Sequence, residues 1–152
     1  MNHEAAVKWY RKAAAQGWAL GKANLGVMYR DGKGVPKDDA AAVRLFTQAA
    51  EQGLAEAQFN LGTQYASGQG VALDGLQPSN WLRLAAAQQN PTAQRVLGLA
   101  LAKGEGVKRN LPEAVRYLRL AVAQGEPGAD AVLQVVARAE AECARNPVPQ
   151  CG

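Results

Sequence analysis

Residues of the same type return every 36 positions along this chain of 152 residues, and this period restricts the fold more than any other feature. Leucines keep the period from Leu25 to Leu133, and a glycine follows the first three of them. Three Gly-x-Gly-Val stretches, at residues 32–35, 68–71 and 104–107, keep the same phase. A period of this length is typical of arrays of small helical units, each of which buries its apolar face against the next unit.

Each 36-residue unit has the pattern of two helices joined by a tight turn. Apolar residues recur at three- and four-residue steps on both sides of the Gly-x-Gly-Val stretch, as one face of a helix requires. Gly32 and Gly34 suit the left-handed conformation that ends a helix, and Asp38 and Asn110 suit the N-cap of the next one. The apolar content is mostly Ala and Leu, which favours close helix packing. We therefore expect an all-α protein, a right-handed α-α superhelix (solenoid) of helix-turn-helix repeats.

The period also predicts where the units begin and end. We expect a single solenoid domain at residues 1–145, with a half repeat at 4–17, full repeats at 18–53, 54–89 and 90–125, a capping helix at about 129–145, and then a C-terminal tail at 146–152. Pro78 falls where the second helix of a repeat would already be under way, so that helix is expected to begin late, near Pro78 or Ser79. The large residues Trp9, Trp81 and Tyr117 keep the period and are expected in the core.

The repeated pattern A-x-x-x-L-G-x-x-Y-x-x-G-x-G-V-x-x-D, followed by A-x-x-(W/Y)-x-x-x-A-A-x-x-G, resembles the Sel-one-like repeats, a family of α-solenoids related to tetratricopeptide repeats. The resemblance covers residues 4–125. It implies a protein–protein interaction module, such as a bacterial adaptor or scaffold or a protein that binds one cognate partner. It implies binding without catalysis.

Cys143 and Cys151 are the only cysteines, and the chain between them contains two prolines. Two cysteines and the distant His3 are too few for a structural zinc site, so the choice is between a disulfide and two free thiols. A bridge would stabilise the fold by about 2–3 kcal/mol in the chain-entropy model. The resemblance extends to the cysteine-rich bacterial branch of the family, whose members are exported and have bridged cysteines at similar spacing, although the repeats of this chain lack cysteines.

Residues that could support catalysis are scarce, with one His, two Ser and three Thr. The alternative function is a hydrolase of the penicillin-binding type, which some cysteine-rich relatives suggest. Neither Ser67 nor Ser79 has a Lys three residues later, so the Ser-x-x-Lys motif of such enzymes is absent. The Gly-x-Gly stretches follow helices, so turn formation explains them better than phosphate binding. We expect no enzymatic activity, no cofactor and no metal ion.

Seventeen Lys and Arg against thirteen Asp and Glu give a net charge of +4. The charges are interspersed, and no basic patch with interleaved aromatic residues is present, so nucleic-acid binding is not expected. No apolar run is long enough to span a membrane, and the chain opens on a helical pattern without a signal peptide. The cysteine pair favours a periplasmic or secreted location over the alternative, the cytoplasm.

A partner is expected in the concave groove, which the first helix of each pair lines in solenoids of this kind. The candidate residues lie two positions before or after an in-phase leucine, or at the turn that follows. They are Ala23, Val27, Arg30, Phe59, Thr63, Arg95, Leu99, Lys103, Ala131, Val135 and Arg138. Because the set combines apolar side chains with cations, we expect a protein or peptide partner that carries apolar and acidic residues.

Overall fold

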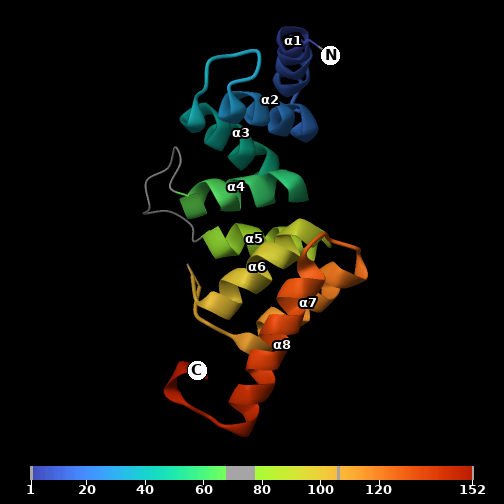
Figure 1. The fold of residues 1–152 in the computed structure, drawn as a ribbon. Helices are drawn as coiled ribbons and strands as arrows, with labels where there is room; N and C mark the ends of the chain where they lie inside the picture. The colour runs from blue at the N-terminus through green and yellow to red at the C-terminus, as the bar shows by residue number, and fades with distance from the viewer. Residues whose placement is uncertain (1, 68–77, 106, 152) are drawn as a thin grey trace. The chain divides into compact units, whose positions relative to one another are not determined.

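The computed structural model describes residues 2–67, 78–105 and 107–151, and these are helical apart from turns and part of the tail (Figure 1). The helices are α1 (His3–Ala15), α2 (Ala19–Asp31), α3 (Asp39–Glu51), α4 (Ala55–Ser67), α5 (Pro78–Ala87), α6 (Pro91–Lys103), α7 (Leu111–Ala123) and α8 (Ala129–Arg145), with a short 3-10 helix η1 (Pro149–Cys151) in the tail. Over these residues the expected all-α repeat fold is confirmed. The stretch at 68–71 and Gly106 lie outside them.

The chain forms two compact units, residues 1–81 and 82–152. In the first unit α1 packs on α2, α2 on α3 and α3 on α4. In the second unit α6 packs on α7, and α7 packs on α8 (Figure 1). Each of these helices thus packs mainly on its neighbours in sequence, which is the contact pattern of a repeat protein.

Left-handed residues end the helices at positions that the period predicts. Gly32 follows α2 with a φ of 66°, and Gly104 follows α6 with a φ of 73°. After α5, Gln89 has a φ of 67° at the position where other units have a glycine. A side chain in this conformation costs about 1–2 kcal/mol, so the glycine of the other units relieves strain that Gln89 retains.

The helix starts also follow the sequence. Asp38 Oδ1 accepts a hydrogen bond from the Ala41 N–H at 3.0 Å and caps α3, and Asn110 Oδ1 accepts one from the Glu113 N–H at 3.0 Å and caps α7. α5 begins at Pro78, as expected from the proline, because a proline in the first turn of a helix loses no internal hydrogen bond.

On the second helix of each full repeat, the most buried large residue lies one position after the residue that the sequence analysis favoured. These residues make up the core column. Phe46, Leu82 and Leu118 keep the 36-residue period and are at most 4% exposed. Trp81 is buried as expected, and Tyr117 is half-buried.

Trp9 is 69% exposed, so its assignment to the core is wrong. The helix α1 packs on α2 and buries Ala6 and Val7. Trp9 lies on a different side of α1, where the ammonium of Lys12 is 5.1 Å from the centroid of its ring. A ring in this position gains a cation–π contact in place of burial.

Two glycines of the period make room for the core column. A Cβ added to Gly26 would lie 2.8 Å from the ring of Phe46, and a Cβ added to Gly98 would lie 2.7 Å from Cγ of Leu118. Both distances are shorter than a van der Waals contact. At these two positions the glycine of the Leu-Gly pair is therefore required by the large residue on the next helix.

Candidate functional site

An apolar trough with a volume of about 430 Å³ lies between α6 and α8 in the second unit. Its lining residues are Leu99, Ala102, Lys103, Arg109, Leu111, Ala131, Val132, Val135, Val136 and Ala139. All of them are apolar except Lys103 and Arg109, and both exceptions are cations. The surface therefore suits an apolar ligand that carries negative charge.

The trough forms because α6 and α8 are the first helices of successive repeats and both pack on α7. On α8 the residues Val132, Val135, Val136 and Ala139 recur at helical spacing and make one apolar face. Val136 is buried, whereas Val135 remains 68% exposed. The face of α8 is thus wider than α7 covers, and its open edge becomes a wall of the trough.

The structure brings four of the proposed groove residues together in this trough, namely Leu99, Lys103, Ala131 and Val135. Arg138 lies on the same helix and is exposed, but it does not line the trough. Inside the second unit, the first helices α6 and α8 thus contribute side chains to one surface, and binding of a partner there stays a prediction.

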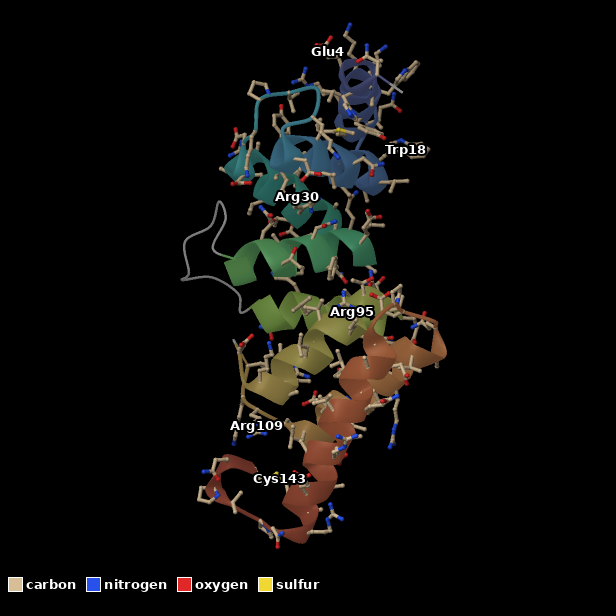
Figure 2. The ribbon with its side chains drawn as sticks, viewed as in Figure 1. Glu4, Trp18, Arg30, Arg95, Arg109 and Cys143 are labelled. Atoms are coloured by element: carbon tan, nitrogen blue, oxygen red, sulfur yellow. A yellow bond between two sulfur atoms is a disulfide. The ribbon has the colours of Figure 1, made fainter. Side chains whose placement is uncertain are left out.

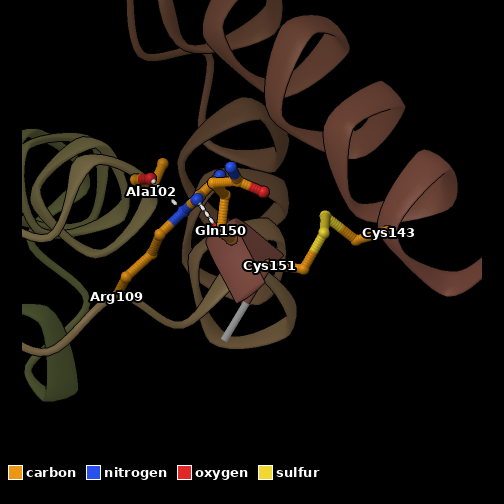
Figure 3. The surroundings of a disulfide bond; sticks show 5 residues. All are labelled: Ala102, Arg109, Cys143, Gln150 and Cys151. Carbon is orange, nitrogen blue, oxygen red and sulfur yellow. Dashed lines mark hydrogen bonds between the residues drawn. A yellow bond between two sulfur atoms is a disulfide. The ribbon is translucent and has the colours of Figure 1, made fainter. Parts of the chain in front are cut away.

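Arg109 was not among the sequence candidates, although it lines the trough. Its Nε donates to the Ala102 carbonyl at 3.1 Å, and its Nη1 donates to the Gln150 carbonyl (Figure 3). The glycine of the turn lies beside it, because a Cβ added to Gly104 would lie 3.3 Å from Cβ of Arg109. A Cβ added to Gly32 would lie at the same distance from Cβ of Lys37. The basic pair at 108–109 was the only sequence signal for this residue.

A disulfide joins Cys143 of α8 to Cys151 of η1, with the two Cα atoms 5.6 Å apart. The choice that the sequence left open is thus decided for the bridge. The bridge folds the tail back on α8 and carries Gln150 to Arg109 (Figures 2 and 3).

Two arginines of the proposed groove have carboxylate partners instead of an open surface. Arg30 donates to Asp31 Oδ1 at 2.8 Å and to Asn60 Oδ1 at 3.0 Å, and its hydrogen bond holds the pKa of Asp31 below the ordinary value. Arg95 donates to Glu126 Oε1 at 3.0 Å. Through Asn60 and Glu126 these side chains tie successive repeats together within each unit.

A third half-buried arginine, Arg83, pairs with Glu113, and this carboxylate raises the pKa of the guanidinium. Glu113 also accepts a hydrogen bond from the side chain of Asn110 at 3.3 Å. Glu113 therefore connects Arg83 of α5 to the start of α7.

The remaining groove candidates lie in the first unit. Ala23 is fully buried in its core, so it cannot face a partner, and the reason is that α2 packs this side on α3. Val27 is partly buried against the same core. Phe59 and Thr63 of α4 are half-buried, and the Thr63 hydroxyl donates to the Asn60 carbonyl at 2.8 Å.

Groups of acidic, His and Cys side chains that could hold a metal ion do not occur among the described residues. Over the same part of the chain, no helix has the length and apolar character needed to cross a membrane.

Paired helices at a fixed period, left-handed glycines between them and glycines beneath a core column define an α-helical repeat protein. A family model for the Sel1 repeat matches residues 2–18, 19–54, 55–90 and 91–126. The chain therefore belongs to the Sel1 repeat family. The fold of this family is generally a scaffold for protein–protein interaction.

The solved structures that are similar to this chain include the following two. One is c5321, a protective antigen present in uropathogenic Escherichia coli strains and displaying an SLR fold, with 37% identity and a TM-score of 0.78 over 84% of this chain and 27% of that one. The other is a Sel1 repeat protein from Oxalobacter formigenes, with 35% identity and a TM-score of 0.78 over 86% of this chain and 53% of that one. The chain thus spans less than two thirds of either protein. No curated protein matches it.

Proposed function

We propose that this chain is a protein–protein interaction module that holds a partner segment with apolar and acidic residues in the trough between α6 and α8. The observation that carries the proposal is the composition of the trough, in which apolar side chains surround two cations and no carboxylate lines the surface. Burial of apolar side chains contributes about 25 cal/mol per Å² of surface removed from water. The cations add selectivity, because they favour acidic segments and disfavour basic ones.

The segment that fits is short. The volume of about 430 Å³ lies in the range of small-ligand pockets, so it accommodates a few side chains and leaves the rest of the partner outside. Exposed Val135 lies where an apolar anchor would be covered on binding. Residues that become buried at the centre of an interface contribute most of its affinity.

Selection from a library of random peptides tests the chemistry of the site. Peptides of about 12 residues extend to about 40 Å and so offer more residues than the few that the trough accommodates. We expect the selected peptides to combine Leu, Ile, Val or Phe with Asp or Glu, and to bind the purified protein in calorimetry. Selection of basic peptides, or of none that bind, would contradict the proposal.

The substitution Val135→Glu tests the location. A carboxylate in the apolar wall is costly to bury and repels the acidic residues of the peptide. We therefore expect the affinity for a selected acidic peptide to fall at least about tenfold. Leu120→Glu is the matched control, because Leu120 is an exposed apolar residue of α7 that does not line the trough. Equal effects of the two variants would place the peptide elsewhere.

A further inference from the structure

We propose that the disulfide-bonded tail makes Arg109 the carboxylate anchor of the trough, so that the partner carries an Asp or Glu next to the apolar side chain it inserts. This inference rests on the proposed function and specifies the chemistry of the same site. It adds a positioning role for the Cys143–Cys151 bridge, which lies outside the apolar wall of the trough.

The pairing of the arginines singles out Arg109. The half-buried arginines are Arg30, Arg83, Arg95 and Arg109. The first three have carboxylate partners in Asp31, Glu113 and Glu126. Within the described part of the chain Arg109 forms no such ion pair, and it donates hydrogen bonds to two main-chain carbonyls. It is therefore the half-buried guanidinium that is available to a carboxylate from outside.

The two carbonyls hold the guanidinium without neutralising it. Nε donates to Ala102 and Nη1 donates to Gln150, which leaves the Nη2 protons for a ligand. A side chain fixed in this way loses little rotamer entropy on binding. Its apolar surroundings strengthen a charge-assisted hydrogen bond, since water competes less there.

The position of one of these two carbonyls, that of Gln150, depends on the bridge. Gln150 precedes Cys151, and residues 146–150 are all exposed, so few other contacts hold this part of the tail. Arg109 lines two further surface hollows beside the trough, both of which include Cys151. Without the bridge, the tail would move away from Arg109, which would keep only its hydrogen bond to the Ala102 carbonyl.

Paired peptides test the anchor. The probe is an acidic peptide from the selection, together with its counterpart in which each Asp is Asn and each Glu is Gln. For Arg109→Gln, we expect the acidic peptide to bind about tenfold more weakly and the amide peptide to bind as before. Arg119→Gln, a change of equal charge at an exposed position of α7, should affect neither peptide. If Arg109→Gln and Arg119→Gln weaken the acidic peptide equally, the anchor assignment is wrong.

The double substitution Cys143→Ser, Cys151→Ser tests the role of the bridge. We expect this variant to retain its helical circular dichroism, because α8 still packs on α7. Its affinity for the acidic peptide should fall towards that of the amide peptide. Reduction of the wild-type protein by a dithiol, which gives two protons and two electrons to the bridge and becomes a disulfide itself, should have the same effect. Unchanged affinity in both cases would overturn the inference.

An NMR measurement tests the positioning without any ligand. The Arg109 Nε–Hε group should be rigid in the bridged protein and mobile in the double serine variant, as judged by its heteronuclear relaxation. Equal mobility in the two proteins contradicts the positioning role even where peptide binding changes.

The two proposals fail in different ways. If Val135→Glu abolishes peptide binding while Arg109→Gln and the serine variant leave it intact, the trough is the site and the anchor is wrong. If Val135→Glu has no effect, the proposed function of the trough is itself wrong.

Discussion

At the scale of single residues, buried glutamines join neighbouring helices by hydrogen bonds that hydrophobic patterning does not reveal. Gln94 is fully buried, donates to the Ala86 carbonyl at 3.2 Å and accepts from Gln124 Nε2 at 2.9 Å. Gln58, 36 residues earlier, donates to the Ala50 carbonyl at 3.2 Å. Each of them ties the first helix of a repeat to the end of the preceding helix, and the period of the two glutamines was visible in the sequence.

Replacing Gln94 with Leu preserves the volume but removes these hydrogen bonds. The Ala86 carbonyl and the Gln124 amide then lose a partner, so we expect the free energy of unfolding to fall by about 1–3 kcal/mol. Urea denaturation followed by circular dichroism measures the change. Gln134→Leu, at an exposed position of α8, should change it by less than about 0.5 kcal/mol, and equal stability of the two variants would refute this role.

Asp31 makes a smaller contribution that depends on pH. Its pKa is lowered by the hydrogen bond from Arg30, so the folded protein holds the ionised form more tightly than the unfolded chain does. The resulting stability is complete above the ordinary value of 3.8 and is lost as the pH falls through the lowered value.

For Asp31→Asn we therefore expect a loss of less than about 1 kcal/mol near pH 7, because the pair is partly exposed. The difference from wild type should disappear in strong acid. Denaturation curves at a series of pH values measure it, and a difference that grows on acidification would contradict the assignment.

At the scale of the elements, the spacing between paired helices is set by a glycine and the large side chain that covers it. In the second unit Gly98 of α6 lies against Leu118 of α7, and in the first unit Gly26 lies against Phe46. A glycine inside a helix costs about 1 kcal/mol relative to alanine. The glycine is nevertheless favoured here, because the methyl group of an alanine would push the two helices apart.

The substitution Gly98→Ala should consequently destabilise the protein despite the better helix propensity of alanine. Overpacking costs about 1–3 kcal/mol, which exceeds the gain in propensity. In a Leu118→Ala background the space is open, and the same substitution should stabilise by up to about 1 kcal/mol. A double-mutant cycle from urea denaturation measures this change of sign, and additivity of the two substitutions would show that the glycine has another role.

At the scale of the whole molecule, the period predicted the helices, the turns and the caps because each of these depends on local residue types. Asp38 caps a helix, and Gly104 ends one, whatever lies further away. The offset of the core column from Trp81 to Leu82 was harder to predict, since neighbouring residues on a helix share a partly buried face.

The features that the sequence did not predict depend on contacts between distant segments. The exposure of Trp9 depends on which side of α1 another helix covers. The contact between Arg109 and Gln150 joins residues 41 positions apart and requires the tail to turn back. The pairing of Cys143 with Cys151 was compatible with the sequence, but so were two thiols. The sequence therefore predicted apolar residues of α6 and α8 that line the candidate site. It did not predict Arg109, the cation that the loop contributes.

Lys37 and Arg109 occupy equivalent places in two repeats, and in both cases the left-handed glycine of the turn lies beside the side chain. Neither residue is part of a helix, so exchanging one for the other leaves the residues of the helices unchanged. The proposed anchor thus lies at a turn position whose residue type can change while the helices of the array keep theirs.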